Sequence, residues 1–254
     1  MRILKVISRL LDYPGEELRG FRADLAMEIS CAREISPDTR GALLQVLEQL
    51  CDGELMDVQE SYGLLFDQGR SLSLHLFEHV HGESRDRGQA MVDLMNVYQQ
   101  NGFELDALEL PDYLPLFLEY LSNRPDLEVR EWLGDVAPIM AQVAARLEER
   151  GDIGLRYALQ LEALLMIAGE QKQLAALRGS FAQEEPDNTP EAIDREWEET
   201  AVTFGPEQAC TNGSKPAASQ AEPLQWVDTA TAAPKAVPVT NKNPGSANVR
   251  GYAS

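Results

Sequence analysis

The chain has 254 residues, of which 44% are hydrophobic, and its formal net charge is -20 at pH 7. This length is enough for one large domain or two small ones, and the acidic balance argues against nucleic-acid binding, which needs clustered Lys and Arg. The same charge favours a basic or amphipathic partner. Three widely spaced cysteines, no signal-peptide pattern and no stretch near the ~20 apolar residues of a membrane span predict a cytoplasmic protein.

Apolar residues recur at helical spacing through most of the chain and predict a series of helices. Ser36 and Pro37 form a typical N-cap and first helical position, and Asn101-Gly102 is a typical helix end. The predicted helices cover residues 2–12, 16–31, 37–51, 55–66, 71–81, 84–98, 111–121, 126–150 and 153–181. Pro138 falls inside the long helix 126–150 and is expected to kink or split it.

The segments between these helices are short, and no strand hairpin or internal repeat is recognisable. The sequence therefore predicts a single all-α bundle over residues 1–182. From residue 183 the chain is first acidic and then rich in Ala, Pro and Thr, which predicts a disordered tail over 183–254 because little apolar surface can be buried. Trp197 and Phe204 suggest a docking segment at 193–204, and a chance pair of aromatic residues in a linker is an equal alternative.

The stretch from Tyr62 to Gly88 contains all three histidines of the chain. Residues 75–79 match H-x-x-E-H, in which two histidines one helical turn apart bind Zn²⁺ and Glu78 acts as general base. A zinc-dependent hydrolase is the sharpest enzyme hypothesis, but the motif is short, marks no third ligand, and lies in a cramped helix. Histidines hydrogen-bonded to nearby carboxylates are the favoured interpretation.

Further charges surround this motif, and the stretch contains no GxGxxG or P-loop pattern for a nucleotide. Glu78, Glu83, Arg85 and Arg87 either form ion pairs that fix the turn at Gly82 or clamp a ligand through an arginine fork. The ion-pair interpretation is favoured over ligand binding, because charged side chains beside apolar faces are costly unless they are paired.

Two other features have a structural and a functional interpretation. Glu109 and Asp112 flank a proline at a predicted helix start, where capping by Asp112 is the simplest role. Met91 and Met95 belong either to the core or to a groove for an amphipathic helix, with the core as the default. No Ser-His-Asp or Cys-His arrangement is recognisable, so these residues give no support to a catalytic site.

Four motifs together are long enough to be specific. They are Leu10–Pro14 (LLDYP), Tyr62 with the Leu-Phe-Asp at 65–67, Ser73–Met91 (SLHLFEHVHGESRDRGQAM) and Glu109–Leu121 (ELPDYLPLFLEYL). Over about residues 1–181 the chain resembles the respiratory nitrate reductase molybdenum cofactor assembly chaperones. These are the NarJ branch of the TorD/DmsD superfamily of redox-enzyme maturation chaperones.

The resemblance implies a cytoplasmic, all-helical chaperone of the TorD/DmsD type that is not an enzyme, and it makes the H-x-x-E-H match part of a chaperone motif. Such chaperones bind the N-terminal segment of the apo catalytic (α) subunit of nitrate reductase. They hold it ready for insertion of the molybdenum bis-guanine-dinucleotide cofactor, delay membrane assembly, and are absent from the final enzyme. The resemblance implies no permanently bound cofactor, a role in nitrate assimilation, and contact with cofactor-biosynthesis proteins as a further option.

In the wider superfamily a loop with a Glu-x-Pro-Asp-His-like sequence contributes to the client-peptide site. Tyr113 stands at the histidine position here, which is a departure from that pattern. Direct contact between Arg85 or Arg87 and the molybdenum cofactor is a weaker option. The resemblance implies a client-peptide site drawn from Tyr62, Phe66, His75, Glu78, His79, Glu83, Arg85, Arg87, Met91, Glu109, Pro111, Asp112 and Tyr113.

Overall fold

The computed structural model describes residues 1–82, 84–105, 109–189, 191–192 and 194, so Glu83 and the segment around Trp197 lie outside the described residues. The described helices are α1 (Arg2–Leu11), α2 (Glu16–Gly20), α3 (Arg22–Cys31), α4 (Pro37–Asp52), α5 (Leu55–Phe66), α6 (Leu76–His81), α7 (Arg85–Gln100), α8 (Leu114–Ser122), α9 (Asp126–Glu148), α10 (Gly151–Ala168) and α11 (Gln171–Leu177). Within this part of the chain no strand forms, and the predicted all-α class is confirmed. None of these helices combines the length and apolar character that crossing a membrane requires.

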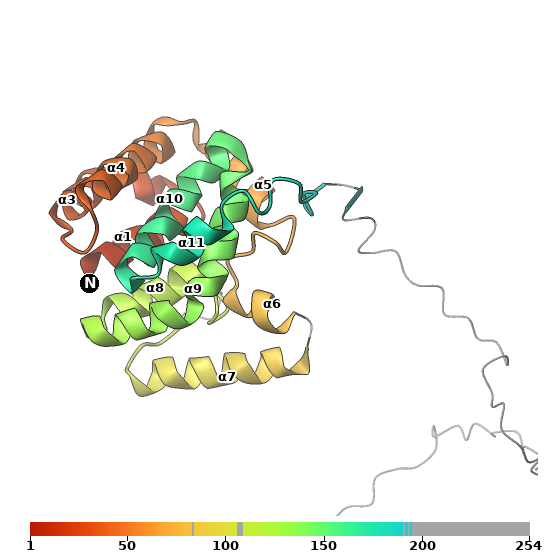
Figure 1. Cartoon of the computed structure of the whole chain (residues 1–254). Coiled ribbons are helices and arrows are strands. Elements are labelled where there is room, and N and C mark those ends of the chain that lie inside the picture. The colour runs from red at the N-terminus through yellow and green to blue at the C-terminus, as the bar shows by residue number, and fades with distance from the viewer. Residues whose placement is uncertain (83, 106–108, 190, 193, 195–254) are drawn as a thin grey trace, which may run out of the picture. The chain divides into compact units, whose positions relative to one another are not determined.

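Helix α1 lies in the interior of the bundle, where it contacts α3, α8 and α10 (Figure 1). Most of its side chains are buried, because Ile3, Leu4 and Ile7 repeat at helical spacing on the core face. The buried Ser8 hydroxyl donates a hydrogen bond to the Pro115 carbonyl at 2.6 Å. This bond holds the first turn of α8 against α1 and so positions the loop that leads into α8.

Helices α9 and α10 form the most extensive helix pair of the bundle, and α11 packs beside them. Helix α9 runs unbroken through Pro138, so the split that was one of the two predicted outcomes does not occur. Pro138 is on the exposed side of α9. The carbonyl of Gly134, four residues earlier, loses its helical partner to the proline, and water can hydrate it on this side.

Two helices that the sequence predicts as continuous are each divided in the structure. The helix predicted over 16–31 breaks at Phe21, whose φ of -95° and ψ of 6° are non-helical, directly after the weak helix former Gly20. The helix predicted over 153–181 ends at Gly169, whose φ of 84° is in the left-handed region. Glycine adopts this conformation without the penalty of a Cβ atom, which makes it a common helix terminator.

The bundle keeps contacts beyond the predicted boundary at residue 182. The Asp187 carboxylate accepts hydrogen bonds from the backbone N–H groups of Arg70 (2.8 Å) and Ser71 (2.7 Å) and from the Ser71 hydroxyl (2.7 Å). Burial opposes ionisation of this carboxylate, but the bonds from Ser71 and Arg70 lower the pKa of Asp187. The Asn188 amide also donates to the Leu64 carbonyl at 2.7 Å. The segment after α11 is therefore attached to the end of α5.

Candidate functional site

Two segments that are far apart in the sequence, residues 74–77 and 112–114, are joined by backbone hydrogen bonds. The Leu114 N–H donates to the Leu74 carbonyl at 2.9 Å, and the Leu76 N–H donates to the Asp112 carbonyl at 3.0 Å. They form an isolated antiparallel bridge between His75 and Tyr113. This pairing holds His75 and Tyr113 in extended backbone, and α6 begins later than the predicted residue 71 and α8 later than the predicted residue 111.

The Asp112 side chain is fully buried and lies at the N-terminus of α6. Its Oδ2 accepts a hydrogen bond from the Phe77 N–H at 3.1 Å, and its Oδ1 lies 3.3 Å from His75 Nδ1. The prediction that Asp112 caps its own helix is wrong, because Tyr113 is the N-cap of α8 and makes no side-chain cap bond. Asp112 instead caps α6 from a distant part of the sequence, where unpaired N–H groups and the helix dipole favour a carboxylate.

His75 is partly buried beside this carboxylate, with 29% of its side chain exposed. The hydrogen bond to Asp112 raises the pKa of His75 above its usual value of 6.5, although burial opposes the charged form. The prediction that the histidines bond to neighbouring carboxylates therefore applies to His75. It does not apply to His79, whose Nε2 lies 2.8 Å from the Ser73 carbonyl and donates to it.

The His75–Asp112 pair predicts a pH dependence of stability. Because the pKa of His75 is higher in the folded than in the unfolded chain, the stabilisation is fully present below pH 6.5 and is lost as the pH rises through the raised pKa. We expect His75→Gln to lower the free energy of unfolding by about 1 kcal/mol at mildly acidic pH and by much less at alkaline pH. Urea unfolding of both proteins across a pH series measures this difference, and a difference independent of pH would contradict the pair.

A second set of contacts continues from Tyr113 to the end of α1. The Tyr113 hydroxyl donates to Asp12 Oδ1 at 3.2 Å and lies 2.9 Å from the Tyr62 hydroxyl, which reaches the Leu11 carbonyl at 3.0 Å. Burial raises the pKa of both tyrosines, so both hydroxyls stay protonated and act as donors. Asp12, Tyr62, His75, Asp112 and Tyr113 are termed the latch here, because they connect α1, α5, and the loops before α6 and α8.

The H-x-x-E-H residues do not converge on one point. His75 faces Asp112, His79 bonds to the Ser73 carbonyl, and Glu78 forms an ion pair with Arg87 at 3.0 Å. His75 also precedes α6 as its N-cap, so the two histidines do not occupy successive turns of one helix. The described residues contain no group of three or more His, Cys, Asp or Glu side chains that could hold a metal ion. The zinc-hydrolase alternative therefore has no support.

Four other residues of the predicted client site are either buried or paired with each other between two helices. Phe66 is buried, with its ring 4.7 Å from that of Tyr62. Pro111 is buried, and its carbonyl accepts the Tyr98 hydroxyl at 2.8 Å. The Glu78–Arg87 pair joins α6 to α7, as the ion-pair interpretation predicts.

The remaining predicted residues are more accessible to a partner. Arg85, in the first turn of α7, and Glu109, in the loop before α8, are exposed, and neither forms an ion pair within the described part of the chain. Met91 is half-buried on α7, and Met95 on the same helix is 36% exposed. Thus the structure separates the predicted set into a buried frame and a smaller accessible group.

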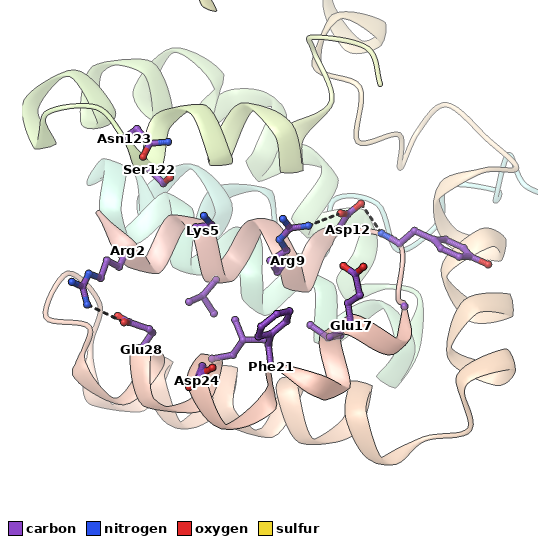
Figure 2. A pocket seen from close by; sticks show the side chains of 15 residues that line it. Arg2, Lys5, Arg9, Asp12, Glu17, Phe21, Asp24, Glu28, Ser122 and Asn123 are labelled. Carbon is purple, nitrogen blue, oxygen red and sulfur yellow. Dashed lines mark hydrogen bonds and ion pairs between the residues drawn. The ribbon is translucent and has the colours of Figure 1, made fainter. Parts of the chain in front are cut away.

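A groove with a volume of about 650 Å³ lies between α1 and the α2–α3 pair, and the sequence did not predict it (Figure 2). Three cations share one face of α1, a pattern that could have indicated a functional surface. Acidic residues of α2 and α3 line the other side of the groove, and apolar residues line it as well. The lining residues that define this α1 groove are Arg2, Lys5, Val6, Arg9, Asp12, Tyr13, Gly15, Glu17, Leu18, Phe21, Asp24, Leu25, Glu28, Ser122 and Asn123.

Comparison with known proteins gives a consistent result. Residues 33–151 match the family model described as nitrate reductase delta subunit. Over 207 residues, which are 82% of this chain and 86% of the relative, the sequence is 43% identical to the nitrate reductase molybdenum cofactor assembly chaperone NarJ of Escherichia coli (strain K12). The chain belongs to this family of nitrate reductase assembly chaperones.

Two further relatives extend the comparison. The probable nitrate reductase molybdenum cofactor assembly chaperone NarW of Escherichia coli (strain K12) is 44% identical over 85% of this chain and 89% of its own length. The probable chaperone NarJ of Bacillus subtilis (strain 168) is 33% identical over 63% of this chain and 84% of its own length. The family consists of assembly chaperones and not of catalysts, so the predicted family and the prediction that the chain is not an enzyme are both confirmed.

The matched region contains most of the latch. Tyr62, His75, Asp112 and Tyr113 all lie within residues 33–151, whereas Asp12 and the rest of α1 precede them. The loops before α6 and α8 therefore lie within the region that the family model matches.

Proposed function

We propose that this chain is a dedicated chaperone for the catalytic (α) subunit of a respiratory nitrate reductase. It binds the apo subunit and keeps it competent for insertion of the molybdenum cofactor. The observation that carries the proposal is the 43% identity to an assembly chaperone over 82% of the chain. The acidic net charge of -20 further suits a basic or amphipathic client segment.

Within this role, the chaperone recognises the N-terminal segment of the α subunit and acts in the cytoplasm. It delays membrane assembly until the molybdenum bis-guanine-dinucleotide cofactor is in place, and it is absent from the final enzyme. The chaperone thereby supports nitrate assimilation and meets cofactor-biosynthesis proteins through the client. These steps follow the resemblance carried by the Tyr62–Met91 and Glu109–Leu121 motifs.

The latch has a framing role in this proposal. Asp112 and Tyr62 are buried, so they shape the loops before α6 and α8 and do not offer surface to a client. Arg85 and Glu109 are exposed, and they are the residues of the predicted client site best placed to contact a partner. Because the latch already fixes these loops, less conformational entropy is lost when a partner binds to Arg85 and Glu109.

Co-purification tests the proposal directly. In cells that cannot make the molybdenum cofactor, the full-length chain should be recovered in a stable complex with a tagged nitrate reductase α subunit. In cofactor-competent cells that lack the chaperone, we expect at least a tenfold loss of nitrate reductase activity. The molybdenum content of the purified α subunit should fall in parallel. A cofactor-loaded, fully active enzyme made without the chaperone would contradict the proposal.

A further inference from the structure

We infer that residues 178–188, termed the strap, are a releasable segment that controls the order of the loop between α5 and α6. The strap follows α11 and runs from α9 to the end of α5 (Figure 1). Its anchor is the Asp187 carboxylate, which binds in a turn at residues 69–71. Release of this anchor loosens the loop that leads to the latch, while the helical bundle stays folded.

The turn at residues 69–71 has the geometry of an anion-binding site. The consecutive backbone N–H groups of Arg70 and Ser71 both donate to Asp187 Oδ2, at 2.8 and 2.7 Å, and the Ser71 hydroxyl donates to Oδ1 at 2.7 Å. Successive N–H groups that converge on one point form concavities that bind carboxylate and phosphate groups. Asp187 therefore acts as an intramolecular ligand, supplied by a segment 116 residues away from Ser71.

Gly69 makes room for this ligand. Gly69 does not have a positive φ, so its backbone conformation is open to other residues. A Cβ atom at this position would lie 2.6 Å from Asp187 Oδ1 and 2.7 Å from Asp187 Cγ. A side chain at residue 69 would therefore push the carboxylate out of the turn. The glycine serves the close approach of Asp187, which identifies the turn as a site made for this anchor.

The rest of the strap is attached mainly by polar contacts at the surface. Arg178 pairs with Glu148 at 3.0 Å, and Arg146 pairs with Glu184 at 2.8 Å. Phe181, the largest apolar side chain of the strap, is only partly buried, and no strap side chain is fully buried. Surface ion pairs contribute little to stability. A segment held in this way opens at a much lower free energy than the core, so the strap can detach without unfolding of the bundle.

Two hydrogen bonds lead from the anchored turn to the latch. The Ser73 N–H donates to the Arg70 carbonyl at 3.2 Å, and the Ser73 hydroxyl accepts the His75 N–H at 3.1 Å. His75 is a residue of the latch, in which its Nδ1 lies 3.3 Å from Asp112 Oδ1. The strap thus holds the first half of this loop, and the latch holds the second half. Loss of the anchor therefore reaches His75 through Ser73.

Amide hydrogen exchange of the full-length chain tests the strap. We expect Asp187→Ala to speed exchange about tenfold at Ser73 and His75, whose N–H groups donate elsewhere than to Asp187. The buried amides of α9 and α10 should keep their wild-type rates. The matched control is Asp135→Ala, which removes an exposed carboxylate of α9 and should change none of these rates. Wild-type rates at Ser73 and His75 would overturn the inference, and so would equal acceleration throughout α9 and α10, which indicates global destabilisation.

A second variant removes the anchor without changing Asp187. Gly69→Ala should expel the carboxylate and speed exchange at Ser73 and His75 by a similar factor, because the new Cβ atom occupies its place. In the Asp187→Ala background the same substitution should add less than about a twofold change, since the overlapping atoms are already gone. Independent effects of the two substitutions, which multiply in the double variant, would contradict a shared site.

Free formate tests whether the turn binds an anion. In Asp187→Ala, formate should slow exchange at Arg70 and Ser71 about twofold relative to chloride at equal ionic strength, because it replaces the missing carboxylate. It should have no such effect in the wild-type chain, where Asp187 fills the turn, or after Gly69→Ala, where the Cβ atom narrows it. Equal rates in formate and chloride for Asp187→Ala would overturn the assignment of an anion site. These measurements need only the chain itself, so either result leaves the proposed function standing.

Discussion

The Asp112→Ala variant is expected to have a free energy of unfolding about 3 kcal/mol lower than that of the wild-type chain. The Asp112 side chain is fully buried and accepts the Phe77 N–H at 3.1 Å, with His75 Nδ1 at 3.3 Å. Alanine removes both interactions and leaves a polar group at the start of α6 without its partner. Urea unfolding followed by circular dichroism at mildly acidic pH, where His75 is charged, measures the loss.

Two control variants separate the latch from general effects of substitution. Asp112→Asn keeps an oxygen that can accept the Phe77 N–H but removes the charge, so its loss should be about half as large. Asp135→Ala removes an exposed carboxylate on α9 and should change stability by less than about 0.5 kcal/mol. An Asp112→Ala protein as stable as Asp135→Ala would show that the latch does not hold the loops together.

The same substitution has a consequence for client binding. The Asp112 carbonyl also accepts the Leu76 N–H, and the Leu114 N–H donates to the Leu74 carbonyl, so the loop before α8 keeps these backbone attachments when the side chain is lost. We expect the loops to lose order before the bundle unfolds, because the core of α9 and α10 does not depend on them. The variant should therefore bind the α subunit more weakly at temperatures where it is still folded.

The helices follow from the sequence because each depends on local periodicity and local caps. Ser36 accepts a hydrogen bond from the Thr39 N–H at 3.1 Å, and Pro37 opens α4, as the sequence predicts. Helix α5 has the predicted bounds. Two of the errors are single positions where a helix is interrupted, at Phe21 and Gly169, and two others are the late starts of α6 and α8. There the backbone conformation depends on packing as well as propensity.

The latch could not be derived from local patterns. Asp112 and Phe77 are 35 residues apart, and Tyr113 and Asp12 are 101 residues apart. A capping rule places a carboxylate on its own helix, whereas Asp112 caps another one. The motifs of the family resemblance nevertheless contain every residue of the latch. They therefore identified the segments that form it, but not the hydrogen bonds between them. The H-x-x-E-H pattern is a local pattern that misled. Its spacing fits a zinc site, but His75 bonds to Asp112 and His79 bonds to the Ser73 carbonyl.

The α1 groove was missed for a different reason. Its two walls come from α1 and from the α2–α3 pair, and the sequence predicted one continuous helix over 16–31. The break at Phe21 places that ring beside the groove and allows α2 and α3 to differ in direction. A short interruption of one helix therefore shapes this groove. Arg2, Lys5 and Arg9 are visible in the sequence, but nothing local identifies the carboxylates that face them.

The Gly154→Ala variant is expected to lower the free energy of unfolding by about 3 kcal/mol, through steric overlap. Gly154 is in the first turn of α10, directly after the short connection from α9. A Cβ atom at this position would lie 2.1 Å from the Leu147 carbonyl oxygen and 2.6 Å from the Arg150 Cβ. Both contacts are far below van der Waals distance, and one is with backbone, so the end of α9 and the start of α10 would have to move apart.

Gly134→Ala is the matched control for this substitution. Gly134 is inside α9, and a Cβ atom built there meets nothing within 4 Å. Alanine is the better helix former, so this variant should be more stable than wild type by roughly 0.5–1 kcal/mol. Both variants replace glycine with alanine, but the expected changes in the free energy of unfolding have opposite signs. Urea and thermal unfolding of the two variants measure these changes. Equal stability of the two variants would contradict the close approach of α10 to the end of α9. The opposite signs would show that the α9–α10 junction requires glycine for space.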